Sequence, residues 1–115
     1  MKILRFEDIV AWQKSKELTL LVYKIFKNNR DFSFKDQIQR AAVSIMNNIA
    51  EGFERNSDKE LKNFFYIAKG SCGEVRSMCL IARDLKYIRG EEFKQIYELS
   101  IETSRLLSGF IKKLT

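Results

Sequence analysis

Residues 57–85 read SDKELKNFFYIAKGSCGEVRSMCLIARDL and predict one long α-helix. At its start, the Ser57 hydroxyl is expected to accept the backbone N–H of Glu60, and the Glu60 side chain to reach back in a capping box. Core residues then recur at heptad spacing: Leu61, Phe64, Ala68, Ser71, Val75, Met78, Ala82 and Leu85. At 1.5 Å per residue, this helix is about 44 Å long.

Three further segments show the same helical periodicity. They run from about Phe6 to Asn28, from Lys35 or Asp36 to about Phe53, and from Glu91 to about Leu114. Gly52 is interpreted as the stop signal of the second helix. Because the connections are short, neighbouring helices should be antiparallel. The prediction is therefore all-α: an antiparallel up-down four-helix bundle formed by residues 1–115 as a single domain.

Composition agrees with a helical protein of the cytoplasm. The chain has 115 residues, no proline and five glycines, so helix breakers are scarce. Glu7 and Asp8 fall where the apolar part of a secretory signal would lie. The longest uncharged run, residues 41–50, is too short to cross a bilayer. Cys72 and Cys79 lie about 10 Å apart along one helix, too far for a disulfide, as expected of a cytoplasmic protein.

The charge of the chain favours a polyanionic partner. The formal net charge is +6, which suits nucleic acid or an anionic membrane, although many proteins carry such charge for solubility alone. One row of cations follows a seven-residue spacing along the long helix: Lys62, Lys69, Arg76 and Arg83, with Arg55 in the same register before it. Such a row can track phosphates, or it can be the solvated flank of a core seam with acids nearby.

The long helix also carries more apolar residues than one core stripe needs. Tyr66, Ile67, Leu80 and Ile81 lie off the main seam, and Gly70 and Gly73 share the outer side. A helix that is apolar on several faces is usually buried on several faces, and a second copy of the chain is the expected cover. The alternative is that these are scattered exposed apolar residues, which are normal on protein surfaces.

Catalysis is not expected. The chain has no histidine, so the commonest general base and metal ligand are missing, and no phosphate-cradling glycine loop is present. Cys72 and Cys79 fall on the core side of their helix and are unsuited to nucleophilic work. Asn48, Glu51 and Arg55 share one helical face and are interpreted as a structural network. We therefore expect no enzyme, no metal and no cofactor.

Several ordered segments together resemble a known family. They are residues 6–14 (FEDIVAWQK), 37–45 (QIQRAAVSI), 48–52 (NIAEG), 57–60 (SDKE) and 67–71 (IAKGS), followed by Glu74. They look like the four-helix-bundle family of proteins encoded in intervening sequences of bacterial 23S rRNA genes. The accessory variability determinant of diversity-generating retroelements is a relative. Met46 stands where the family usually has proline, so the second helix is expected to be straighter.

The resemblance implies a bacterial, cytoplasmic bundle that assembles into a homopentameric ring with a basic surface suspected of binding nucleic acid. It supplies no catalytic residues. We therefore expect a non-enzymatic homo-oligomer that binds RNA or DNA with little sequence specificity. Candidate phosphate contacts are Lys62, Lys69, Arg76 and Arg83, with Arg40 and Arg55 as further candidates. The alternative is an oligomeric scaffold that docks a protein partner, with no nucleic-acid binding of its own.

Overall fold

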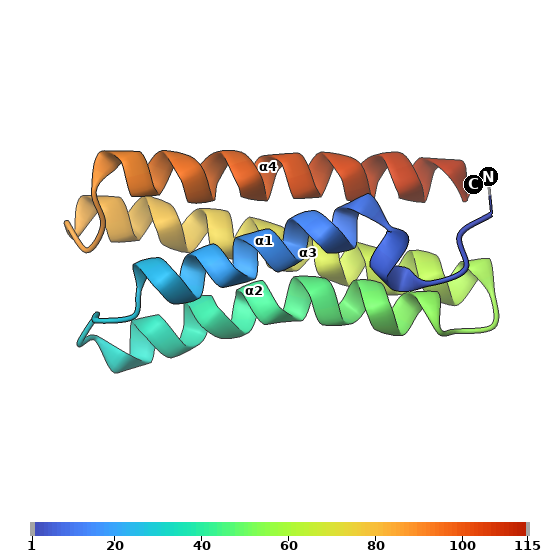
Figure 1. Ribbon diagram of the computed structural model, residues 1–115, viewed down its shortest axis with the longest axis horizontal. Coiled ribbons are helices and arrows are strands. Elements are labelled where there is room, and N and C mark those ends of the chain that lie inside the picture. Colours follow the sequence, from blue (N-terminus) through green and yellow to red (C-terminus); the bar gives the residue numbers. More distant parts are fainter. Residues whose placement is uncertain (1, 115) are drawn as a thin grey trace.

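The computed structural model describes residues 2–114, which form a short 3-10 turn and four α-helices. The elements are η1 (Phe6–Asp8), α1 (Val10–Ile25), α2 (Phe32–Phe53), α3 (Asp58–Asp84) and α4 (Gly90–Lys113). Figure 1 shows the helices side by side, each running opposite to the one before it, with both ends of the chain at the same end of the bundle. The predicted all-α, antiparallel four-helix bundle is confirmed.

The long helix α3 begins and ends as its local sequence dictates. The backbone N–H of Glu60 donates to the Ser57 hydroxyl over 3.2 Å, as predicted. The Glu60 side chain also reaches back, and its carboxylate accepts from the same hydroxyl at 3.3 Å. At the other end, Lys86 adopts a left-handed φ of 62°. The backbone N–H groups of Lys86 and Tyr87 then donate to the carbonyls of Arg83 and Ala82, which closes the helix as a Schellman motif.

The two N-terminal helices differ from the prediction at their starts. The first helix does not begin at Phe6, because Ile9 is extended (φ −76°, ψ 121°) and separates η1 from α1. The helix α2 begins at Phe32, earlier than predicted, because the Asp31 carboxylate accepts the backbone N–H of Phe34 at 3.2 Å. A carboxylate in this position satisfies a free donor of the first turn and favours the helix start.

Gly52 was predicted to stop α2, and that interpretation is wrong. The helix continues to Phe53, and no described glycine has a positive φ. Gly52 is instead buried where α2 and α3 approach each other: a Cβ at this position would lie 2.7 Å from the Phe64 Cβ and 3.3 Å from the Leu61 carbonyl oxygen. The glycine is needed for close packing of two helices.

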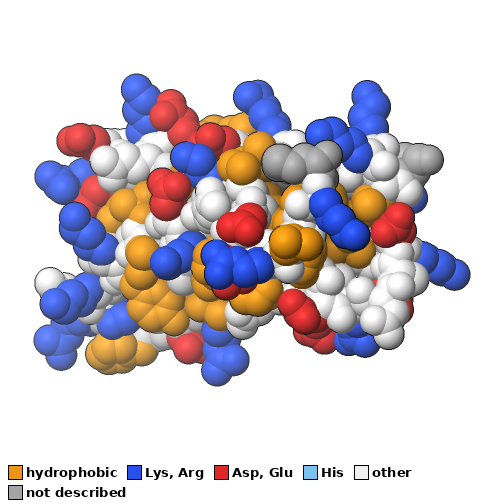
Figure 2. All heavy atoms as spheres, turned by 45° about the vertical axis from the view of Figure 1, so that its right-hand side comes forward, with side chains coloured by type: hydrophobic (Ala, Val, Ile, Leu, Met, Phe, Trp, Pro, Cys, Tyr) orange, Lys and Arg blue, Asp and Glu red, His pale blue; other side chains and the backbone are white. Residues whose placement is uncertain are grey.

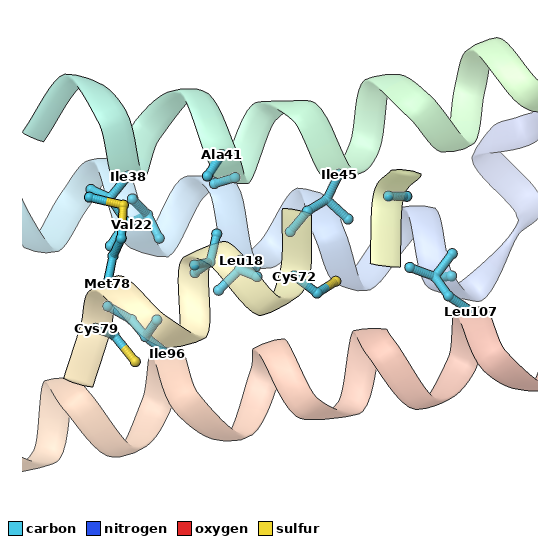
Figure 3. Close-up of a cluster of buried hydrophobic side chains, with 14 of the residues drawn as sticks. Leu18, Val22, Ile38, Ala41, Ile45, Cys72, Met78, Cys79, Ile96 and Leu107 are labelled. Carbon is cyan, nitrogen blue, oxygen red and sulfur yellow. The ribbon is translucent and has the colours of Figure 1, made fainter. Parts of the chain in front are cut away.

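All four helices contribute to one core (Figure 3). Fully buried side chains include Leu18 of α1, Ile45 of α2, Cys72 of α3 and Leu107 of α4. Burying a leucine or isoleucine side chain contributes roughly 1.5–3 kcal/mol. Among the described residues, α1 packs on α2 and α4, and α3 packs on the same two helices, so α1 and α3 occupy diagonal positions. Their outer sides therefore face opposite directions.

Within the described residues, no helix combines the length and apolar character needed to span a membrane.

Candidate functional site

Three of the six candidate cations are already engaged by carboxylates. The Arg40 guanidinium lies 2.8 Å from the Asp36 carboxylate one turn earlier on α2, away from the row on α3. The Arg55 guanidinium contacts Glu51 at 2.7 Å and Glu60 at 3.7 Å. A nearby carboxylate offsets part of the positive charge that the cation presents to an external phosphate.

Arg83 is engaged twice. Its guanidinium lies 3.2 Å from the Asp84 carboxylate and stacks over the Phe93 ring of α4, with the guanidinium carbon 4.6 Å from the ring centre. Arg55 stacks in the same way over Phe64, at 4.7 Å. Aromatic faces attract guanidinium groups and restrict their movement. The side chains of Arg83 and Arg55 therefore contribute in part to packing within the bundle.

Lys62, Lys69 and Arg76 differ from these three arginines. Within residues 2–114 none of the three side chains makes an ion pair. Arg76 is exposed, while Lys62 and Lys69 are half-buried along the flank of α3. Successive members are about 10.5 Å apart along the helix axis, given 1.5 Å per residue. The structure therefore presents a row of three cations that remain available to bind anions, which we call the α3 cation row.

The α3 cation row borders the seam between α3 and α4. Lys69 lies in a shallow groove whose other lining residues are Tyr66 on α3 and Ser108, Ile111 and Lys112 on α4. Periodicity along α3 alone does not reveal this α4 wall, because it depends on how two helices pair in space. Lys112 therefore joins the basic surface without having been predicted.

The thiols of Cys72 and Cys79 lie in the core, close to cations on α3. Burial raises the pKa of Cys72 to about 12, although Lys69 and Arg76 oppose this shift. Burial likewise raises the pKa of Cys79 to about 11, against the opposing charges of Arg83 and Arg76. Both thiols are therefore protonated at neutral pH, which makes them poor nucleophiles.

The predicted oligomer-interface residues separate into two strips on α3. Tyr66, Gly73 and Leu80 alternate with the cation row at spacings of three and four residues. The outer strip contains Ile67, Gly70 and Ile81, and its two isoleucines are 52% and 50% exposed. Leu85 was predicted to be a core residue, but it is 51% exposed and extends this outer strip.

The predicted polar network at the end of α2 forms only in part. Arg55 contacts Glu51, as expected of residues one turn apart. Asn48 instead donates to Ser44, reaching its carbonyl oxygen at 2.8 Å and its hydroxyl at 3.0 Å. The Ser44 hydroxyl also accepts from Ser71 across the α2–α3 seam. The group therefore serves helix packing.

The charges on the surface are mixed. On the face in Figure 2, Lys and Arg side chains are spread widely and carboxylates lie among them, with hydrophobic patches and uncharged surface between. In the described part of the chain, no group of three His, Cys, Asp or Glu side chains is placed to hold a metal ion. Every buried side-chain nitrogen or oxygen of these residues has a hydrogen-bond partner. The candidate site is thus a surface row of charges.

Comparisons with known proteins agree with this architecture. The family model described as "23S rRNA-intervening sequence protein" matches residues 7–109. A solved crystal structure from Bacteroides thetaiotaomicron VPI-5482 is described as a protein of unknown function from the S23 ribosomal protein family. It is 27% identical to this chain, with a TM-score of 0.83 over 89% of this chain and 98% of its own. No curated protein matches the chain.

Proposed function

This chain belongs to the family of 23S rRNA-intervening sequence proteins, and we propose that it is a non-enzymatic, cytoplasmic, homo-oligomeric bundle that binds RNA or DNA. The phosphates bind along the α3 cation row, and Lys112 lies beside it. The observation that carries the proposal is the absence of any ion-pair partner for Lys62, Lys69 and Arg76 among the described residues. Cations held in a row on a rigid helix can neutralise successive phosphates and release their counterions.

The proposed binding has little sequence specificity. Contacts with phosphates position a nucleic acid, whereas sequence is read through base edges. Lysine binds a phosphate as a point charge, without the fixed two-bond geometry of arginine. The proposal therefore predicts similar affinities for nucleic acids of different sequence.

The proposed binding is tested with fluorescent RNA and DNA at low salt. Lys69→Glu/Arg76→Glu should abolish measurable binding, because it replaces two phosphate contacts with two repulsive charges. Lys24→Glu/Lys27→Glu, at the end of α1 and in the turn that follows it, is the matched control: it changes the net charge equally, away from α3. An equal loss of RNA and DNA affinity in both double variants would show that net charge, and not the α3 cation row, governs binding.

Self-association is proposed from two exposed strips on opposite sides of the bundle. One is the outer strip of α3, and the other lies on α1, where Leu20 and Tyr23 are 61% and 46% exposed. Contact between two unlike surfaces is head-to-tail, and it closes into a ring when the rotation between subunits allows. This arrangement is compatible with the homopentameric ring that the family resemblance implies.

Assembly is tested by light scattering on Ile81→Glu. A charge in the centre of a buried apolar contact is costly, so the molar mass should fall to that of a single chain. Glu98→Lys, on the outer side of α4, is the control for a change of charge at an exposed position. An unchanged mass for Ile81→Glu would remove the outer strip of α3 from the interface.

A scaffold that docks a protein partner is the second candidate. It is favoured by the exposed Ile67, Ile81 and Leu85, which form an apolar surface on α3. Salt separates the two functions, because phosphate binding weakens steeply as salt rises whereas apolar docking does not. A well-formed oligomer that binds neither RNA nor DNA at low salt would favour the scaffold.

A further inference from the structure

Tyr66 lies within the α3 cation row. Lys62, Tyr66, Lys69, Gly73 and Arg76 follow one another at alternating spacings of four and three residues. Residues at these spacings lie on one face of an α-helix. An aromatic ring is therefore placed between two lysines that have no carboxylate partner among the described residues.

The Tyr66 side chain lies at the surface of the bundle. It is 53% exposed. Within residues 2–114 its hydroxyl makes no hydrogen bond and its ring stacks on no other aromatic ring or cation. Tyr87 differs, since its hydroxyl bonds to Asp31 and its ring packs on Phe34. The Tyr66 ring is thus available to an external partner.

The groove beside Tyr66 has the size and charge for part of a nucleic-acid strand. Its volume is about 380 Å³, within the range of small-ligand sites of roughly 300–1,000 Å³. Its lining consists of Tyr66, Ser108, Ile111 and two lysines, Lys69 and Lys112. This lining suits a ligand that combines a flat apolar group, such as a nucleic-acid base, with a neighbouring negative charge, such as a phosphate.

Gly73 keeps the path along the row open. A Cβ at this position would meet no atom within 4 Å. The surface of α3 between Lys69 and Arg76 is therefore open directly above Gly73. A strand that passes Tyr66 can continue toward Arg76.

We propose that this groove binds single-stranded nucleic acid, with one base stacked on the Tyr66 ring and the flanking phosphates on Lys62 and Lys69. This inference rests on the proposed function and adds the class of substrate. A base in a duplex is stacked on its neighbours and does not offer its face to a protein ring, whereas unpaired bases stack readily on aromatic side chains. The site therefore favours single strands over duplexes.

The test compares an oligouridylate of about 12 nucleotides with an RNA duplex of about 12 base pairs, lengths within reach of a single-strand site. Fluorescence anisotropy measures both affinities for the intact chain and for Tyr66→Leu, Tyr66→Phe and Phe32→Leu. Tyr66→Leu should weaken binding of the oligouridylate about ten-fold and of the duplex less than about two-fold, because only the single strand loses a stacking contact. Tyr66→Phe keeps the ring and should remain within about two-fold of the unaltered protein.

Two controls make the result specific. Phe32→Leu removes another exposed aromatic ring, 67% exposed at the start of α2 and outside both strips proposed for self-association, and should leave both affinities unchanged. Light scattering on Tyr66→Leu should give the mass of the unaltered protein. A lower mass together with equal losses for both probes would assign Tyr66 to a subunit interface and overturn the inference.

The remaining outcomes separate this inference from the proposed function. If both probes bind and Tyr66→Leu changes neither affinity, base stacking is overturned while phosphate binding stands. If neither probe binds at low salt, the proposed function fails and the stacking site fails with it.

Discussion

Asp31 and Tyr87 connect two loops that are far apart in the sequence. The Tyr87 hydroxyl donates to the Asp31 carboxylate over 2.7 Å, across 56 residues, at the end of the bundle where the α1–α2 and α3–α4 connections meet. This bond lowers the pKa of Asp31, with a further contribution from the backbone N–H of Phe34. It raises the pKa of Tyr87. Sequence alone does not identify this pair, because both residues lie in loops without periodicity.

This pair gives the stability of the bundle a defined dependence on pH. Because the pKa of Asp31 is lowered in the fold, its contribution is present above the ordinary aspartate value of about 3.9 and disappears as the pH falls through the folded value. Tyr87→Phe should therefore melt at a lower temperature than the unaltered protein at pH 6, and the difference should narrow toward pH 3. Thermal unfolding followed by circular dichroism measures it. A difference that stays constant over this range would show that the carboxylate does not contribute through this bond.

Lys86 occupies a backbone conformation that suits glycine. Its φ of 62° lies in the left-handed region, which costs a residue with a Cβ roughly 1–2 kcal/mol. Lys86→Gly should therefore raise the free energy of unfolding by up to about 1 kcal/mol, measured by urea denaturation. Lys94→Gly, at an exposed position inside α4, should lower it by about 1 kcal/mol. Destabilisation by both substitutions would contradict this account of the α3 terminus.

At the scale of the helix, the sequence predicts α3 better than α1 and α2. The Ser57–Glu60 cap and an unbroken heptad pattern locate α3 to within a residue of its observed start. The start of α1 was misplaced because the extended conformation of Ile9 interrupts an apolar pattern that continues through it. The start of α2 depends on a cap by Asp31, which the prediction assigned to the preceding loop.

Gly52 shows what helical periodicity cannot reveal. A glycine near a helix end is usually interpreted as a stop, whereas here it permits α2 and α3 to touch. Gly52→Ala forces a Cβ against the Phe64 Cβ and should lower the free energy of unfolding by about 1–3 kcal/mol. Gly109→Ala is the matched control, because a Cβ there meets nothing within 4 Å and should stabilise α4 by about 0.5–1 kcal/mol. Urea denaturation of both variants checks the pair, and a stabilised Gly52→Ala would contradict the close contact.

At the scale of the whole molecule, the sequence locates the α3 cation row but not its surroundings. The seven-residue spacing places Lys62, Lys69, Arg76 and Arg83 on one side of α3. It does not predict that Arg83 stacks on Phe93, or that Lys112 faces Lys69 across a groove. Those relations depend on the packing of α3 against α4. The three-dimensional structure is therefore needed to tell which cations are paired with other side chains and which are available to bind phosphate.

The arrangement of the four helices also separates two possible uses of α3. Its flank beside α4 carries the cation row, while its outer side carries Ile67, Ile81 and Leu85. Because these surfaces are distinct, phosphate binding and subunit contact can take place on one helix without competing. The exposed strip on α1 faces the opposite direction, as a head-to-tail assembly requires.

The salt dependence of nucleic-acid binding tests the central claim most directly. The logarithm of the affinity for one RNA is measured against the logarithm of salt concentration, for the intact protein and for Lys62→Ala, Lys69→Ala, Arg76→Ala and Arg40→Ala. Each of the first three should make the slope shallower by about 0.7–0.9, because each removes one phosphate contact. Arg40→Ala should leave the slope unchanged, since that guanidinium lies on α2, away from the α3 cation row, and is paired with Asp36. Phosphate binding by the α3 cation row would be contradicted if the four variants had the same slope as one another. It would also be contradicted if the intact protein did not bind RNA at low salt.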